Sequence, residues 1–358
     1  MNAAYKPEMR KFVILLSLSV IVFLAGFFSQ LIENIYSEGF YQISSVVQRF
    51  ISSLVPFALG DFLYLLLILF VIRSLFLFYK KIAGKSLKRE DRIKVPLQVV
   101  NFILILYLLF KILWGLNYSR PSVSSQLGIG NEKYNTTQLV LLGKFFIKKL
   151  NHLQKTQKTR YSIAELETKA KAGYDKMEQE NPIFKYHSPA VKPVLNSWII
   201  TKIGIEGYYN PLSGEANVNT RLPAIALPFV TCHEIAHQLG IGREDEANLI
   251  GYLVASNSTD PNFQYSASYA MLKSILFEIR IKSQEDYDAL YTTINPGTIQ
   301  DFKNDRDFWR KYNNEMFGYL DVAFDRFLKL NNQQKGTDSY QDIVLWLYNI
   351  HKKELGNQ

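Results

Sequence analysis

Residues 233–248 read HEIAHQLGIGREDEAN, and this stretch decides the fold that we expect for the second half of the chain. Residues four apart lie on the same face of an α-helix, so His233 and His237 present two imidazoles to one point in space. Gly240 is suited to end that helix, since glycine readily adopts the left-handed conformation of a C-cap. A second helix that begins near Arg243 then turns an acidic face back toward the imidazoles.

Two imidazoles and one carboxylate form the ligand set of a catalytic Zn²⁺ site, which keeps its fourth position open for water. The ion lowers the pKa of that water to about 7, and Glu234 is placed to act as the general base. The third ligand has two candidates, Glu244 and Glu246, which point about 200° apart on a helix. We favour Glu244 because Asn248, one turn later, then accepts a hydrogen bond from the far nitrogen of a liganding histidine. Glu246 stays open as the alternative.

Other residues near the motif are candidates for supporting roles. Cys232, the only cysteine of the chain, faces about 100° away from His233 and is expected to be a small buried residue. Hydrogen bonds to the oxyanion of a peptide carbonyl could come from tyrosine hydroxyls, namely those of Tyr208, Tyr209 and Tyr265. Polar side chains that could line a cleft and hold substrate by strand addition are Glu215, Asn217 and Asn219.

The first third of the chain is far more apolar than the rest. A helix needs about 20 apolar residues to cross a hydrocarbon layer of about 30 Å. Three segments meet that requirement: Phe12 to about Leu31, about Phe57 to Phe78, and about Val95 to Leu116. We therefore predict a three-helix transmembrane anchor over residues 1–116, with loops at 30–56 and 79–94.

The basic residues predict the orientation, because cytoplasmic flanks hold an excess of Lys and Arg. Residues 80–94 are rich in Lys and Arg, whereas residues 30–56 contain only Arg49. The N-terminus and the basic loop are then cytoplasmic, and everything after Leu116 is outside. The formal charge of +9 lies largely at these sites, where it contacts anionic lipids, so the lipid bilayer is an expected partner and nucleic acid is not.

An exported domain with one cysteine has no internal disulfide, which suggests a bacterial protein. We place the chain in the bacterial inner (cytoplasmic) membrane as a multi-pass protein with a periplasmic, extracytoplasmic C-terminal domain over residues 117–358. That domain begins with a Ser- and Gly-containing linker after Asn117.

Apolar spacing between residues 136 and 180 predicts amphipathic helices. The β-branched and aromatic run around Trp198, within residues 194–205, predicts a strand, and residues 215–219 predict an edge strand beside the metal helix. From Pro228 onward the pattern is helical, including an aromatic segment over residues 307–330. The expected fold is a mainly α, α+β zincin-like metallopeptidase domain with a small sheet.

Several of these segments together resemble a bacterial family called domain of unknown function 3810. They are the NYSRP exit at 117–121, the GEANVN segment at 214–219, and the HEIAHQLG and EDEAN elements of the metal motif. The resemblance covers nearly the whole chain and implies an uncharacterised zinc-peptidase-like membrane protein whose substrate is not established. The EDEAN element is similar to the third-ligand helix of gluzincins, which implies zinc binding by Glu244 and a supporting role for Asn248.

The HExxHxxG spacing also resembles the start of the metzincin motif, but Arg243 stands where that family has its third histidine. Arginine cannot lose its proton to bind a metal, so a metzincin is not expected. The function we expect is a membrane-anchored zinc metallopeptidase that acts on a protein, peptide or cell-wall peptide near the membrane.

Two other functions are weighed against the peptidase. Intramembrane proteolysis would need the HEIAH helix inside an apolar span, and the charged run Arg243–Glu246 follows it at once. A non-catalytic scaffold or sensor with a structural zinc site would close the fourth ligand position with another side chain, most often cysteine, and Cys232 points away.

Overall fold

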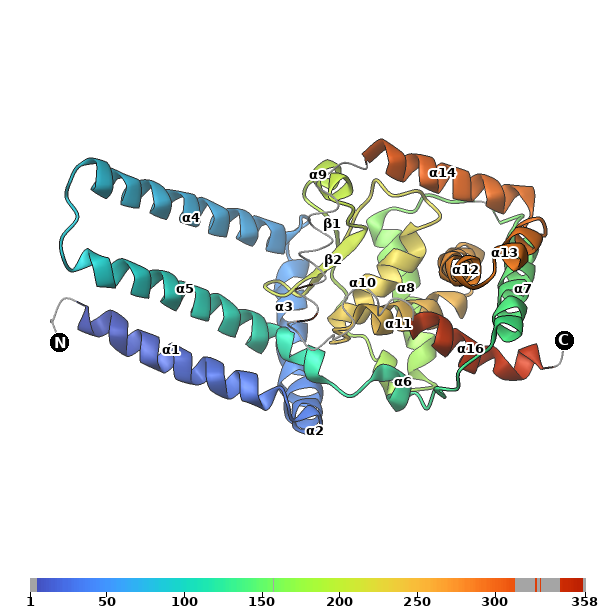
Figure 1. Cartoon of the computed structure of the whole chain (residues 1–358), viewed down its shortest axis with the longest axis horizontal. Coiled ribbons are helices and arrows are strands. Elements are labelled where there is room, and N and C mark those ends of the chain that lie inside the picture. The colour runs from blue at the N-terminus through green and yellow to red at the C-terminus, as the bar shows by residue number, and fades with distance from the viewer. Residues whose placement is uncertain (1–4, 157, 313–325, 327–328, 330–341, 357–358) are drawn as a thin grey trace.

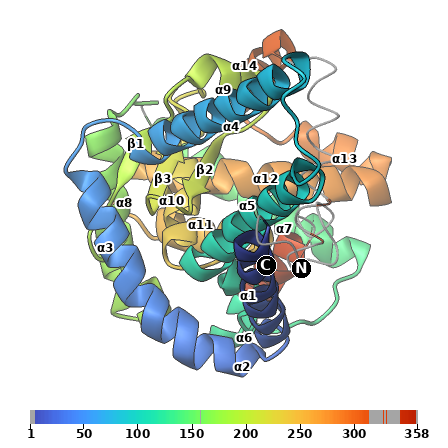
Figure 2. The ribbon, with the colours of Figure 1, turned by 90° about the vertical axis from the view of Figure 1, so that its left-hand side faces the viewer.

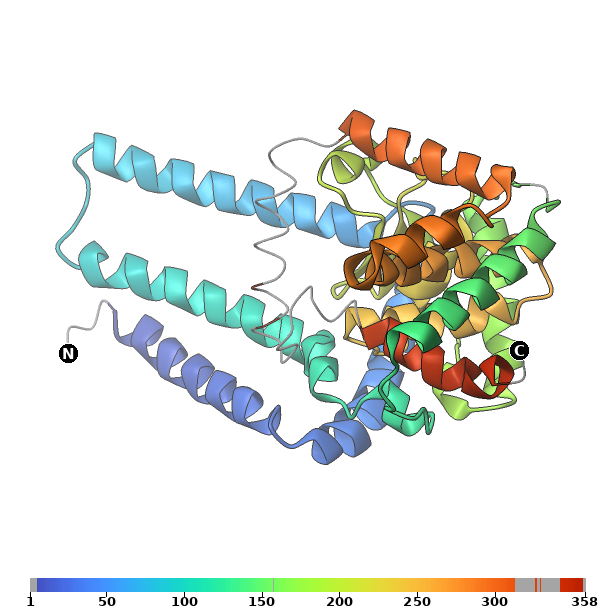
Figure 3. The same ribbon diagram turned by 45° about the vertical axis from the view of Figure 1, so that its right-hand side comes forward.

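The computed structural model describes residues 5–156, 158–312, 326, 329 and 342–356 (Figure 1). It is mostly helical with one small sheet. Three long helices extend from one side of a helical body that contains the sheet and the metal motif, as Figures 1 and 3 show.

The three long helices are α1 (Lys6–Ala25), α4 (Leu59–Ala83) and α5 (Asp91–Leu113). Among the described residues, α4 and α5 are each long and apolar enough to cross a membrane. The segment with α1 passes the same test only together with residues 29–53, from which it is bent by 102°. Two or three helices of the described chain are thus long and apolar enough to span a membrane, and α1 packs along α5.

Residues 30–56, the connection predicted between the first two spans, are mostly helical. This segment contains α2 (Ser29–Leu31), the π-helix η1 (Ile32–Phe40) and α3 (Tyr41–Ser53). These helices cross the base of the body where the long helices meet it (Figure 2). In α3 the exposed side is apolar and the buried side carries Ser45, Arg49 and Ser52, the reverse of the arrangement for a helix in water.

The sheet has three strands, β1 (Val191–Pro193), β2 (Gly207–Asn210) and β3 (Glu215–Val218), in the order β1-β3-β2. β1 runs parallel to β3, and β2 runs antiparallel to it. The expectation of an edge strand at 215–219 is therefore wrong, because β3 is the central strand and β1 and β2 lie at the two edges of the sheet. Ala216 and Val218 are fully buried in the main core beside the metal helix.

The predicted strand at residues 194–205 is also wrong, because residues 197–202 form helix α9 (Ser197–Lys202). The Asn196 side chain accepts hydrogen bonds from the backbone N–H groups of Trp198 and Ile199, each at 3.1 Å. An asparagine N-cap of this kind starts a helix whatever the strand propensity of the residues that follow.

The rest of the body is built from helices around one apolar core. Its elements are η2 (Gly115–Ser119), α6 (Val123–Gln126), α7 (Thr136–Leu153), α8 (Ile163–Glu178), η3 (Pro182–Phe184), α10 (Leu227–Gln238), α11 (Glu244–Ser256), α12 (Pro261–Lys282), α13 (Gln284–Tyr291), α14 (Pro296–Tyr312) and α16 (Asp342–Leu355). The helices predicted within 136–180 and after residue 228 are present. Of the aromatic segment 307–330, only the part up to Tyr312 lies in α14, and most of the remainder is outside the described residues.

Candidate metal centre

A tight turn joins the metal-motif helix α10 to α11. The φ angle of Gly240 is +79°, its N–H donates to His237 O at 3.0 Å, and the Ile241 N–H donates to Ala236 O at 3.2 Å. These two bonds define a Schellman motif, which needs a left-handed residue at the glycine position. α11 then begins at Glu244 and packs along α10, as the sequence predicts.

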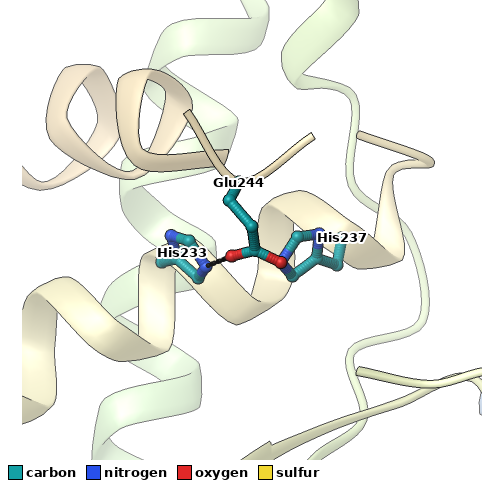
Figure 4. A group of neighbouring side chains, drawn as sticks. All are labelled: His233, His237 and Glu244. Carbon is teal, nitrogen blue, oxygen red and sulfur yellow. Dashed lines mark ion pairs between the residues drawn. The ribbon is translucent and has the colours of Figure 1, made fainter. Parts of the chain in front are cut away.

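The turn brings His233, His237 and Glu244 together (Figure 4). The distance from His233 Nε2 to Glu244 Oε2 is 3.3 Å, and the distance from His237 Nε2 to Glu244 Oε1 is 3.6 Å. One donor atom from each of the three lies within 4.8 Å of the others. Donors at zinc bond lengths of about 2.05 Å in a tetrahedron are about 3.3 Å apart, and the two distances between imidazole and carboxylate atoms are close to that value.

Glu246, the alternative third ligand, is used elsewhere. Its Oε1 accepts a hydrogen bond from the Val123 N–H at 2.9 Å and another from Arg243 Nη1 at 3.1 Å. Its side chain is buried and stabilises the first turn of α6. Of the two acidic residues weighed, only Glu244 lies beside the imidazoles.

The hydrogen bond that holds His237 comes from the backbone instead of Asn248. His237 Nδ1 is 2.6 Å from the carbonyl oxygen of Ile241, so this nitrogen carries the proton and Nε2 is left to face Glu244. Within the described part of the chain, His233 Nδ1 is buried without a partner, and no hydrogen bond joins Asn248 to either ring. His237 Nδ1 therefore uses the Ile241 carbonyl as its acceptor, and the supporting role expected for Asn248 stays a prediction.

The charges at this site shift the pKa values of its groups. Burial would lower the pKa of His237, but the Glu244 carboxylate, Glu234 and the Ile241 carbonyl raise it to about 9. Burial would raise the pKa of Glu244, yet the two imidazoles hold it well below its usual range. The metal-free site therefore favours a protonated His237 beside an ionised Glu244, which is the charge pattern that a bound cation would replace.

Glu234 lies on α10 next to the imidazole pair and against the first residue of strand β2. A Cβ atom added to Gly207 would lie 2.6 Å from Glu234 Oε1, so the glycine leaves room for the carboxylate. Glu234 Oε2 is buried and has no partner among the described residues. Burial raises the pKa of Glu234 to about 7, although the histidines oppose the rise.

The arrangement of side chains at this site suits a divalent cation. Two imidazole nitrogens and a carboxylate converge, the orientation of His237 is fixed by a backbone carbonyl, and a neighbouring carboxyl keeps an unpartnered oxygen. Nitrogen and carboxylate donors in that number form the three-ligand set of catalytic zinc sites.

The tyrosines considered as oxyanion donors have other partners. Tyr208 donates to Asp61, the Tyr209 hydroxyl lies 3.3 Å from that of Tyr41, and Tyr265 donates to Asp301 at 2.5 Å. None of them is hydrogen-bonded to a residue of the metal centre.

The polar residues of β3 are also engaged away from the imidazoles. Glu215 accepts hydrogen bonds from the Leu59 and Gly60 N–H groups at 3.0 and 2.9 Å, and thereby caps α4. Asn219 donates to Thr201 and to the Ile205 carbonyl, while the buried Asn217 amide has no partner in the described structure. Cys232 is fully buried, as expected.

Sequence reasoning missed the residues that hold the C-terminal end of α10. Carbonyl groups of residues 237–240 accept hydrogen bonds from four buried side chains outside the motif: Tyr41 and Arg49 of α3, Trp114 at the end of α5, and Arg120. Arg120 also forms an ion pair with Glu33 of η1 at 2.6 Å. Two signals were available, because Arg49 is the lone basic residue of its segment and Trp114 ends an apolar run.

The family model described as protein of unknown function (DUF3810) matches residues 36–348. The matched region therefore begins within η1 and includes α3, α4 and α5 as well as the helical body. Searches of curated proteins and of solved structures found no match.

Proposed function

The chain belongs to the DUF3810 family, and on that premise we propose that it is a membrane-anchored, zinc-dependent metallopeptidase. The observation that carries the proposal is the convergence of His233, His237 and Glu244 beside the partly unpartnered carboxyl of Glu234. A structural site would not need a buried carboxyl with a free oxygen next to its ligands, whereas a hydrolytic site needs a group that moves protons.

In this proposal the three donors hold Zn²⁺. The bound ion would supply Lewis acidity, which lowers the pKa of a water and polarises a peptide carbonyl. Glu234 accepts a proton from the attacking water and passes it to the nitrogen of the leaving amine, so that the C–N bond breaks without a charged amide anion. In the metal-free site burial raises the pKa of Glu234, so this carboxyl exchanges a proton nearer to neutral pH than an exposed glutamate does.

The remaining residues prepare the site for that transfer. The Ile241 carbonyl fixes the His237 tautomer, and the Gly207 position lets the Glu234 carboxyl approach strand β2. Gly207, the first residue of β2, lies against Glu234, and β2 is an edge strand, so its open side is a place where a substrate backbone can lie.

The same proposal includes the setting of the domain. We infer a zincin-like body over residues 117–358, an anchor over residues 1–116, and a bacterial inner-membrane location with a cytoplasmic N-terminus. The basic loop between α4 and α5 supports this orientation. Labelling of cysteines introduced in that loop and in α13 with a membrane-impermeant maleimide tests it, and labelling of the basic loop from outside would reverse it.

The metal assignment is tested on the full-length chain in detergent. Elemental analysis should find about one zinc per chain in the wild type and in Glu246→Gln, and little in His237→Ala or Glu244→Gln. Glu246→Gln is the matched control, because it changes a neighbouring acidic residue of the same helix. A wild type without stoichiometric metal would refute the proposal.

The catalytic assignment needs a variant that keeps the metal. Glu234→Gln should bind zinc like the wild type and lose at least about 100-fold in cleavage of a peptide library, the usual size of a general-base contribution. If chelation unfolds the chain and neither form cleaves peptides, the zinc is structural and the scaffold reading replaces the peptidase.

A further inference from the structure

Helix α3 exposes its apolar side and buries its polar side. The side chains that face the helical body are Tyr41, Ser45, Arg49 and Ser52. On and just after the helix, four large apolar side chains with 50–71% exposure form the other face: Ile43, Val47, Phe50 and Leu54. Their spacing of four, three and four residues places them on one stripe, so the exposed stripe is continuous.

A second exposed apolar patch lies on α9, where Trp198 and Ile199 are each 48% exposed. The start of this segment is tied to α4, because the Leu195 N–H donates to Asp61 Oδ2 at 2.8 Å. Asp61 belongs to the first turn of α4. The α9 patch therefore lies close to the end of an apolar spanning helix.

The chain on either side of α3 keeps this helix close to the ends of the long apolar helices. Residue 25 ends α1 and residue 59 begins α4, so the segment between them is held at both ends by apolar long helices. The 102° bend after α1 lays it across their axes instead of along them. Figure 2, which looks along the long helices toward the body, shows α3 at the margin of the face from which α4 and α5 project.

The metal centre lies directly behind this face. Trp114 follows the last residue of α5, its indole N–H donates to His237 O at 3.1 Å, and its ring lies 5.9 Å from the His237 ring. Tryptophan at the end of a spanning helix is typical of the membrane–water interface. Arg49 and Tyr41, on the buried side of α3, bind the carbonyl of Gln238 on the same helix end.

We propose that the exposed faces of α3 and α9 lie in the interfacial layer of the bilayer and seat the metal centre on the membrane surface. Resting on the proposed peptidase function, the inference extends to substrate: the bonds within reach are those next to a membrane span. An extended chain covers about 3.3 Å per residue and a helix is about 10 Å thick, so about three residues cross one helix thickness and roughly ten residues, about 33 Å, are an upper limit for the distance from the span.

The first experiment measures the depth of the two patches in the full-length chain. Spin labels are placed at Val47→Cys and Ile199→Cys in a Cys232→Ser background, in vesicles of phosphatidylethanolamine and phosphatidylglycerol. The matched control is Glu285→Cys on the exposed side of α13. Labels at 47 and 199 should collide more with oxygen than with an aqueous nickel chelate, and the label at 285 should do the reverse.

Two outcomes would overturn the surface assignment. Dominant collision with the nickel chelate at 47 and 199 would mean that the patches face water. Dipolar broadening between labels at 47 on different chains would mean that a second copy covers α3 instead of lipid.

The second experiment maps new N-termini in membranes from cells that express the wild type or Glu234→Gln. Termini that require Glu234 should fall within about ten residues of a span end, on the side of the metal domain. Such termini in soluble proteins or far from spans would overturn the substrate class and leave the peptidase intact. If no terminus requires Glu234, the proposed peptidase function and the substrate class are both refuted. The label depths then still test whether α3 and α9 lie in the interfacial layer of the bilayer.

Discussion

Zinc binding to the full-length chain should release close to one proton at neutral pH and should strengthen as the pH rises. In the metal-free site the pKa of His237 is about 9, since Glu244 and the Ile241 carbonyl outweigh the effect of burial. At pH 7 a group with that pKa is neutral in only about 1% of molecules. A metal ligand must be neutral, so binding at this pH removes the proton from His237.

The size of the effect follows from the same pKa. Each pH unit below 9 lowers the neutral fraction about tenfold, so the apparent affinity should rise about 100-fold from pH 6.5 to 8.5, or about 2.7 kcal/mol. Competition with a chelator of known pH dependence gives the affinity. Titration calorimetry in phosphate and in Tris, which differ in ionisation enthalpy, gives the number of protons released.

Two variants separate the causes. Glu246→Gln leaves the partners of His237 unchanged and should keep the wild-type slope, whereas Glu244→Gln removes both a ligand and the main charge that raises the pKa of His237. Its binding should be weaker and less dependent on pH. An affinity that stays flat from pH 6.5 to 8.5 in the wild type, with heats independent of buffer, would refute this account of the site.

Further predictions concern stability and the approach to Glu234. In the metal-free chain the pKa of Glu234 is raised from 4.5 to about 7 and that of His237 from 6.5 to about 9. A group whose pKa is higher in the folded chain than in the unfolded chain contributes most stability at a pH below its unfolded pKa and loses that contribution as the pH rises through its folded pKa. The melting temperature should therefore fall between pH 5 and pH 9, and a rise over that range would contradict the two shifts. Gly207→Ala should keep zinc but lose peptidase activity, since its Cβ would lie 2.6 Å from Glu234 Oε1, whereas Gly356→Ala, whose nearest contact is 3.7 Å, should leave both unchanged. Arg120→Met leaves Glu33 buried without its partner and should lower the free energy of unfolding by about 3–5 kcal/mol, against less than about 1 kcal/mol for Arg306→Met on the surface. Residues 117–358 expressed alone should bind zinc more weakly than the full chain, because they lack Tyr41, Arg49 and Trp114, and equal affinity would show that these contacts are dispensable.

The sequence predicted the part of the site that depends on local geometry. The four-residue spacing of His233 and His237 and the glycine at 240 are properties of a helix and its cap, so they could be derived from neighbouring residues alone. The preference for Glu244 over Glu246 had the same origin. The acceptor that His237 Nδ1 uses could not be read from the sequence, because it is a backbone carbonyl, which every residue possesses and no sequence pattern marks.

Two features of the fold, the helix α9 and the outward-facing apolar side of α3, were not predicted from the sequence. The strand predicted around Trp198 is a helix because Asn196 caps it, and within that helix Trp198 and Ile199 are half exposed while Thr201 is buried. The residues of α3 have an amphipathic period, but that period alone does not say that the apolar face is the exposed one. For α9 a local cap at Asn196 outweighed the strand propensity, whereas for α3 the outward direction of the apolar face depends on surroundings that the sequence does not state.

The contacts at the end of α10 join the metal centre to the apolar helices physically. The last carbonyl groups of a helix have no partners within it, and its C-terminal end carries partial negative charge. Here the arginines Arg49 and Arg120 supply positive charge at that end, and Tyr41 and Trp114 add neutral donors. All four donors come from segments beside the long helices, and His237 is one of the residues whose carbonyl they bind.

A tilt of α5 or a shift of α3 would therefore move the helix end that carries a candidate ligand, and the domain boundary near residue 117 crosses these contacts. The geometry of the metal centre depends on the anchor, which is a physical reason for both to occur within one matched family region.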